Sequence, residues 1–188
     1  MSRLITLQNK YIEERISNQK ELDKIPAEAE LLQKKISSCE QDLEYYKAHK
    51  KATQDSDARI RIREKITREV LDNILETREK KILTYQGFDV ILPANMTREK
   101  PYIYLAREGK YYIELGESSK GNLIRIDNFL EGLPSYLEKL KLNHSKLLEK
   151  ESELKKALSK QENFAIQIEN CQKKLTAIDK ELGVENNE

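Results

Sequence analysis

Hydrophobic positions along this chain follow two different periods, and the change between them divides the sequence into three parts. Before about residue 84 and after residue 133, apolar residues recur every three or four positions, as in amphipathic helices. Between Tyr85 and Leu133 they mostly alternate, as in strands, and this stretch holds five of the six glycines. The pattern predicts an α+β fold, in which two long helical arms carry a small head.

The first arm, residues 1–52, carries apolar residues at alternating spacings of three and four from Leu22 to Tyr46. This spacing is typical of the seam of a coiled coil. Pro26 interrupts the seam, and proline inside a helix removes a hydrogen bond and clashes with the preceding turn. We therefore expect a break or kink near residue 26.

The second arm, residues 133–182, repeats an apolar position every seven residues from Leu133 for most of its length. The phase of this repeat shifts by three residues between Leu158 and Phe164, which predicts a local overwinding of a coiled coil. The remaining residues, 183–188, are expected to form a disordered tail.

Two arms of similar length on either side of a head predict a long antiparallel helical hairpin. If Lys50 faces Leu133, Pro26 lies opposite Ala157, so the disruptions of the two arms fall at the same level. This coincidence favours pairing within one chain. A homodimer through the coiled coil is the alternative.

The head, residues 53–132, is expected to hold a mostly antiparallel four-stranded sheet, since an isolated hairpin is marginal in water and needs a cover. A helix from Asp57 to Thr84 supplies that cover, and Gly87 is expected to end it. Asp127 is expected to cap the following helix. The strands, all between residues 87 and 126, are predicted at Phe88–Leu92, Tyr102–Leu105, Tyr111–Leu115 and Leu123–Ile126.

Tyrosines mark one candidate binding surface, on the second face of the sheet. Tyr102 and Tyr104 lie on one side of their strand, and Tyr112 points away from Tyr111 on the next. Such tyrosines either straddle the core and water or form a partner-binding sheet face, because tyrosine is enriched at interface cores.

A basic cluster marks a second candidate surface, for nucleic acid or an acidic partner. It contains eight basic and three acidic residues in a stretch of 22, whereas the whole chain has a net charge of only +1. Alternatively it is a solvated helix face, because arginines two positions apart do not share one side of a helix. Its members are Lys47, Lys50, Lys51, Arg59, Arg61, Arg63, Lys65 and Arg68.

Groups that would support catalysis are sparse. Gly116–Asn122 resembles a phosphate-binding loop, but Asn122 stands where such a loop has lysine, and a strand is expected to follow. The two cysteines, Cys39 and Cys171, form neither a disulfide framework nor a zinc site by themselves. We therefore expect no enzyme activity and no catalytic, cofactor or metal site. With 36% charged residues and no apolar run long enough to span a membrane, a cytoplasmic protein is expected.

Four segments carry a family resemblance: YQGFDVILPANM, KPYIYL, YYIELG and GNLIRIDNFLEGLPSYLEKL. They resemble a module near the C-terminus of very large proteins of phages and conjugative elements, which join Swi/Snf-type helicase and DNA adenine-methylase domains. The resemblance covers roughly residues 60–182 and is most specific at GNLIRIDN. Helicase and methylase motifs are absent from this sequence, so those activities are not carried over. The resemblance implies a mobile-element setting, in which conflict with host restriction or CRISPR systems is common.

Two functions follow as hypotheses. In the first, a free-standing, non-enzymatic protein of a mobile genetic element binds a host defence nuclease or its nucleic acid, as an anti-restriction or anti-CRISPR inhibitor. The start at Met1 favours this hypothesis. In the second, the chain is a coiled-coil spacer or assembly module of a helicase-type DNA-processing protein.

Overall fold

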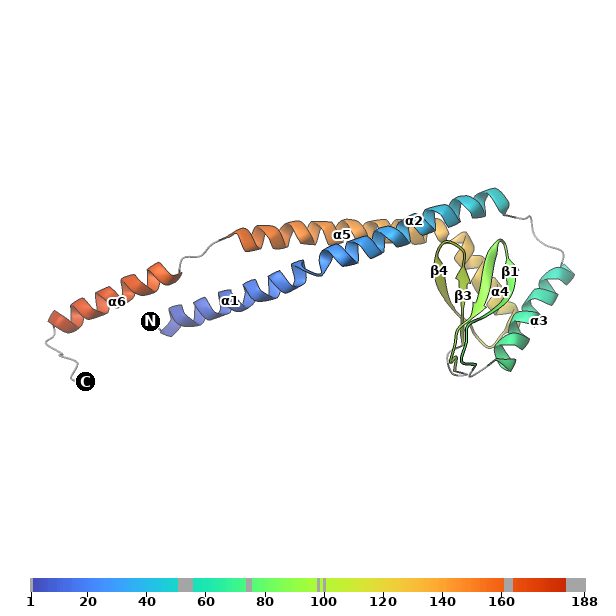
Figure 1. Cartoon of the computed structure of the whole chain (residues 1–188), viewed down its shortest axis with the longest axis horizontal. Helices are drawn as coiled ribbons and strands as arrows, with labels where there is room; N and C mark the ends of the chain where they lie inside the picture. Colours follow the sequence, from blue (N-terminus) through green and yellow to red (C-terminus); the bar gives the residue numbers. More distant parts are fainter. Residues whose placement is uncertain are drawn as a thin grey trace. The chain divides into compact units, whose positions relative to one another are not determined.

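The computed structural model describes residues 2–50, 56–73, 76–97, 99, 101–160 and 164–181. Its elements are six helices and one four-stranded sheet, which confirms the α+β fold (Figure 1). The helices are α1 (Ser2–Leu22), α2 (Ile25–His49), α3 (Ser56–Asp72), α4 (Ser119–Glu131), α5 (Leu133–Ser159) and α6 (Phe164–Glu181). The strands are β1 (Lys80–Tyr85), β2 (Phe88–Leu92), β3 (Tyr102–Ala106) and β4 (Lys110–Glu114).

The chain divides into two compact units rather than at the expected boundaries near residues 52 and 132. A helical unit comprises Met1–Glu30 and Ser145–Glu188, and an α+β unit comprises Leu31–His144. Much of α2 and the first part of α5 thus belong with the sheet. The reason is that their apolar side chains lie in the same hydrophobic core as the strands.

The sheet is an antiparallel meander in the order β1-β2-β3-β4. Gln86 and Gly87 form the two-residue connection between β1 and β2, and both have positive φ, 51° and 86°. A two-residue loop of this kind matches the right-handed twist of the strands it joins. Gly87 is therefore a hairpin residue, and its predicted role as the end of a helix is wrong.

One face of the sheet forms the core of the α+β unit. Residues of β2, β3 and β4 alternate strictly between this face and the other, as the sequence pattern predicted. Helices α3 and α4 contribute apolar side chains to the core, and so do α2 and α5. Its main members are Ile36, Cys39, Leu43, Tyr46, Ile66, Val70, Tyr85, Phe88, Val90, Leu92, Ile103, Leu105, Tyr111, Ile113, Leu123, Ile126, Leu130, Leu133, Leu137 and Leu140.

The predicted helix from Asp57 to Thr84 is wrong in its second half. Helix α3 ends at Asp72, and the Asn73 side chain donates a hydrogen bond to the backbone O of Glu69 at 2.7 Å. Strand β1 follows, and its pairing with β2 shifts register between Lys81 and Leu83. This bulge places the buried β1 residues three positions apart, which is the spacing of a helix.

The predicted fourth strand at Leu123–Ile126 is also wrong, because these residues lie in α4. Ser118 caps this helix, and its Oγ accepts a hydrogen bond from the Gly121 N–H at 3.2 Å. Asp127, the expected cap, lies well inside α4. The short apolar run Leu123–Ile126 fits the period of a helix as well as that of a strand. In the structure, Leu123, Ile126 and Leu130 are buried, which is the spacing of one helix face.

In the helical unit, the expected break near residue 26 is confirmed. Helix α1 ends at Leu22 and α2 begins at Ile25, so Pro26 lies in the first turn, where its missing N–H removes no helical bond. The phase shift after Leu158 corresponds to the end of α5 at Ser159 and the start of α6 at Phe164. Two helices thus take the place of the expected overwound coiled coil.

Helix α1 runs antiparallel to α5 and α6, as predicted, but in a different register. The Tyr11 hydroxyl donates to the backbone O of Lys160 at 2.7 Å, and the Tyr11 and Phe164 rings lie 5.5 Å apart. Glu21 forms an ion pair with Lys150. The prediction that Pro26 lies opposite Ala157 is therefore wrong. These side-chain contacts, and not equal arm lengths, determine which residues of the antiparallel helices lie opposite each other. The expected tail, residues 183–188, lies outside the described residues.

Candidate binding surfaces of the α+β unit

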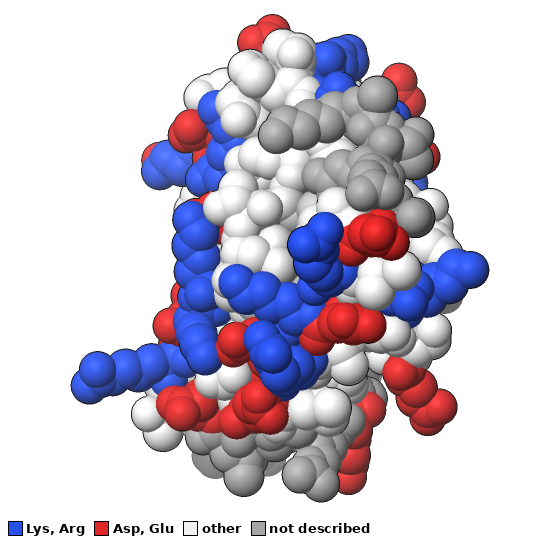
Figure 2. Space-filling model, turned by 90° about the vertical axis from the view of Figure 1, so that its right-hand side faces the viewer, with Lys and Arg blue, Asp and Glu red and all other residues white. Residues whose placement is uncertain are grey.

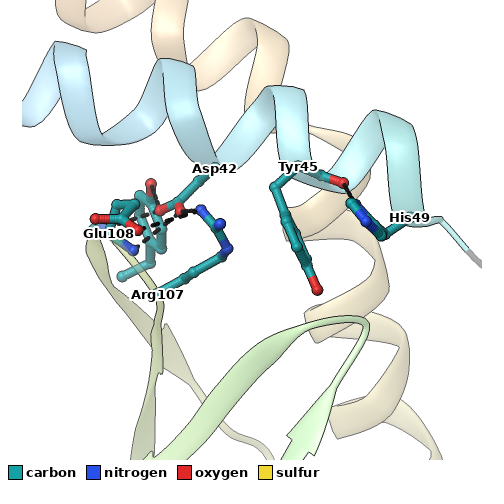
Figure 3. Close-up of polar contacts among 7 residues, drawn as sticks. Asp42, Tyr45, His49, Arg107 and Glu108 are labelled. Atoms are coloured by element: carbon teal, nitrogen blue, oxygen red, sulfur yellow. Dashed lines mark hydrogen bonds and ion pairs between the residues drawn. The ribbon is translucent and has the colours of Figure 1, made fainter.

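A fully buried carboxylate, Asp42 on α2, holds the loop between β3 and β4 (Figure 3). Its Oδ2 accepts hydrogen bonds from the Gly109 N–H at 2.8 Å and from the Tyr111 hydroxyl at 2.7 Å. Its Oδ1 accepts from the Glu108 N–H and from Arg107 Nη1, both at 3.1 Å. Burial and the contact with Asp42 raise the pKa of Tyr111, so its hydroxyl stays a donor. Both carboxylate oxygens are used, which makes Asp42 a structural anchor.

Tyr45 lies one turn along α2 and points in the same direction as Asp42, toward the ends of the strands (Figure 3). The Arg107 guanidinium lies over its ring at 4.0 Å, and the ring of His49 stacks on it at 4.1 Å. A Cβ added to Gly87 would lie 2.2 Å from Tyr45 Cε1. Helix α2 thus contacts the β1–β2 connection at Gly87 and the β3–β4 connection at Arg107. The polar groups of α2 at these contacts therefore stabilise the fold.

A second polar network joins α3, β1 and α4. The Asp127 carboxylate accepts from Arg59 Nη2 at 2.5 Å and from the Tyr85 hydroxyl at 2.6 Å. Burial, and next the hydrogen bond to Asp127, raise the pKa of Tyr85 to about 12. Arg59, predicted to bind a partner, is therefore already engaged by a carboxylate.

The predicted tyrosine face exists as a cluster on the sheet face opposite the core. We use the name tyrosine face for Tyr102, Tyr104 and Tyr112. The ring of Tyr102 lies 5.5 Å from that of Tyr104 and 4.8 Å from that of Tyr112. Tyr112 is 54% exposed, while the other two are half-buried. Lys110 Nζ lies 4.2 Å from the centre of the Tyr104 ring and pairs with Glu79 at 2.6 Å.

A groove of about 510 Å³, here called the aromatic groove, adjoins the tyrosine face at Tyr112. Phe129 and Tyr136 line it together with Tyr111, and the rings of Phe129 and Tyr136 lie 5.8 Å apart. Lys34, Lys35 and Lys110 also line it. Phe129 and Tyr136 are not among the binding residues predicted from the sequence. Their spacing of seven residues is about two helical turns and would place both rings on one side of a continuous helix. Gly132 lies between them, and the structure shows that α5 begins directly after α4, so both rings do line the groove.

The predicted basic cluster is divided between engaged and exposed side chains. Lys50 Nζ lies 3.1 Å from Glu131 Oε1, and Arg59 is held in the network of Asp127. Arg63 is half-buried, and Lys51 lies outside the described residues. The exposed members are Lys47, Arg61, Lys65 and Arg68, and also Lys50 in spite of its ion pair.

On the face that holds α3, Lys and Arg side chains are interspersed with Asp and Glu (Figure 2). Arg61 donates back to its own helix, from Nε to the backbone O of Asp57 at 3.4 Å. Arg59 and Arg63 of the cluster line one pocket, together with Lys120. A single binding surface made of all eight residues stays a prediction, whereas Arg59 and Arg63 do lie together in a pocket.

Gly116–Asn122 follows β4 and runs into the first turn of α4, which begins at Ser119, so the expectation of a following strand is wrong. Asn122 is buried and spans the loop with two hydrogen bonds. The Gly116 N–H donates to its Oδ1 at 2.6 Å, and its Nδ2 donates to the Gly116 O at 3.0 Å. Asn122 thus occupies the inside of the loop, where a phosphate loop would hold its ligand.

Within the part of the chain that the structure describes, no three His, Cys, Asp or Glu side chains are grouped so as to hold a metal ion. No described helix has the length and apolar character needed to cross a membrane. Both cysteines are free thiols, and burial raises the pKa of Cys39.

Comparison of the chain with protein-family models, with curated proteins and with solved structures found no match.

Proposed function

We propose that this chain is a non-enzymatic binding protein and that its α+β unit binds a partner protein through the tyrosine face. One observation carries the proposal: the Tyr102 ring contacts those of Tyr104 and Tyr112 outside the core, and the most exposed of the three, Tyr112, borders the aromatic groove. Tyrosine combines a large apolar ring with a polar hydroxyl and loses little entropy on binding, so it is enriched at the centres of protein interfaces.

The resemblance to a module of phages and conjugative elements supports the identity of the partner. In that setting the protein acts in the host cytoplasm as an anti-restriction or anti-CRISPR inhibitor, and the partner is a host defence nuclease. Binding to the nuclease itself is favoured over binding to its nucleic acid. Two members of the basic cluster are held by carboxylates, and on the face that Figure 2 shows, Lys and Arg side chains are interspersed with Asp and Glu.

The test uses purified protein and a panel of restriction and CRISPR nucleases from bacteria that harbour such elements. The measurements are DNA cleavage by each nuclease and the survival of phage in cells that express the protein. Replacing Tyr102 and Tyr112 by Ser should abolish inhibition while the protein still melts as a folded protein. The matched control replaces Leu71 and Leu142 by Ser, since both are exposed and lie outside the tyrosine face. Inhibition that survives in the tyrosine variant would reject the tyrosine face.

An assembly module is the second candidate function, and exposed apolar residues of the helical unit favour it. Such residues line both α1 and α6: Ile5, Ile12, Ile16, Ile166, Leu175 and Ile178 are all more than 40% exposed. A second copy of the chain would cover them, as in a coiled-coil assembly. Sedimentation velocity tests this candidate: Ile12→Lys should convert a dimer to a monomer, and a wild-type monomer at every concentration would exclude it.

A further inference from the structure

Helices α3 and α4 enclose a pocket of about 320 Å³ on the α+β unit, separate from the tyrosine face. Three cationic side chains line it: Arg59 and Arg63 from α3 and Lys120 from the first turn of α4. Its remaining lining is apolar and consists of Ile60, Leu123 and Ile124. Concentrated positive charge over an apolar floor favours an anionic ligand that carries an organic group.

Arg63 is the unusual member of this pocket. Its side chain is half-buried, and its Nε is buried with no hydrogen-bond partner among the described residues. A buried charged donor without an acceptor is costly, and such groups are rare in folded proteins. Arg63 also lines the pocket, so an anion bound there would neutralise the charge of its guanidinium.

The charges around the pocket leave a surplus. Asp127 is the carboxylate beside Arg59, and it is already paired with that guanidinium. Lys120 is exposed, and among the described residues it has no ion pair. Arg63 and Lys120 therefore remain to neutralise a ligand, and together they match the two charges of a phosphate monoester.

We propose that Arg63 and Lys120, with Arg59 held in place by Asp127, form a site for the phosphate group of a phosphate ester. The guanidinium of Arg63 donates to phosphate oxygens, Lys120 adds a point charge, and the apolar floor contacts the organic part. This site is independent of the proposed partner surface, so either can fail without the other. The phosphate comes either from a small ester or from a nucleic-acid backbone, and both offer the same oxygens.

The experiment follows the Arg63 Nε–H and the amides of α3 and α4 by NMR of the full chain at constant ionic strength. The probes are inorganic phosphate, a nucleoside monophosphate, an oligothymidylate without terminal phosphate, and acetate. We expect saturable shifts with phosphate or a phosphate ester and none with acetate. Replacing Arg63 or Lys120 by Gln should weaken binding about tenfold, as for the loss of one charged hydrogen bond.

The matched controls replace Lys65 or Arg68 by Gln, and each removes one charge from an exposed position of α3. Lys120→Gln keeps the test decisive if Arg63→Gln fails to fold, because Lys120 is exposed. Tighter binding of the nucleoside monophosphate identifies a small ester, and tighter binding of the oligothymidylate identifies a nucleic-acid backbone. Equal shifts with acetate, equal losses in the controls, or no binding of any phosphate would overturn the proposal.

Discussion

The Oδ2 atom of Asp42 lies 2.8 Å from the backbone N of Gly109, and this contact joins α2 to the β3–β4 loop. Asp42 comes from a helix that sequence patterning assigns to a coiled-coil arm. In the structure its carboxylate is buried and accepts four hydrogen bonds from the hairpin. The helix and the sheet are therefore parts of one unit.

Replacing Asp42 by Ala should destabilise the protein by about 3–5 kcal/mol, the usual cost of removing one partner of a buried ion pair. The change leaves Arg107, two backbone N–H groups and the Tyr111 hydroxyl without their acceptor. Chemical denaturation measures the free energy of unfolding. The control is Asp89→Asn, which breaks a half-exposed pair with Lys81 and should cost below about 1 kcal/mol. Equal costs would show that Asp42 is not an anchor.

Gly87→Ala should destabilise the protein by about 1–3 kcal/mol, because a residue with a Cβ is strained at positive φ. The new Cβ would also collide with the Tyr45 ring. Gly121→Ala is the control: it lies in α4, where its Cβ would be 3.4 Å from Ser118 Cβ, and alanine favours a helix. Thermal melting of both variants checks the prediction, and a neutral Gly87→Ala would contradict the packing of Tyr45 on the hairpin.

Tyr85 should make stability fall at high pH. Its pKa is raised from 10.0 to about 12 in the folded state, so the neutral hydroxyl is favoured there. Its stabilising contribution is complete below pH 10 and is lost as the pH rises toward 12. Two pKa units correspond to about 2.7 kcal/mol. Denaturation curves from pH 8 to 12 measure the loss, which should be smaller in Tyr85→Phe but unchanged in the exposed control Tyr112→Phe.

The register of the helical unit is testable by crosslinking. Cysteines at Glu21 and Lys150, in a chain with Cys171 replaced by Ser, should be joined by a short reagent within one chain, because these two residues form an ion pair. The control places a cysteine at Ile12 and keeps Cys171, which is the pairing expected from arms of equal length. Efficient crosslinking of the control would support that other register, and crosslinks only between chains would support a dimer.

Arg63→Met should stabilise the protein by about 1 kcal/mol or more when phosphate is absent, since it removes a buried donor without a partner. Arg68→Met is the exposed control on the same helix and should change the unfolding free energy by less than about 0.5 kcal/mol. Denaturation in chloride and in phosphate buffer compares them. A destabilised Arg63→Met in both buffers would assign Arg63 to packing alone.

Local patterns in the sequence predict the strands well where burial simply alternates. Phe88, Val90 and Leu92 face the core, and so do the buried residues of β3 and β4. The break near Pro26 is predicted for a similarly local reason, since proline restricts its own turn. The predictions fail where a bulge changes the period. Ile82 and Tyr85 are buried three positions apart in β1, which a helix would also produce.

The residues of the candidate surfaces were likewise predicted where the signal is local and were not predicted where it depends on distant contacts. The sequence by itself determined that Tyr102, Tyr104 and Tyr112 share one face, because side chains alternate along strands. It also determined the α+β class and the helical arms, whose signals are local periods. Only the tertiary structure decided which charges are engaged, since Arg59 finds its carboxylate 68 residues away and Asp42 finds its donors more than 60 residues away. Contacts between distant segments depend on register and on packing, and neither is encoded in the spacing of residues along one element.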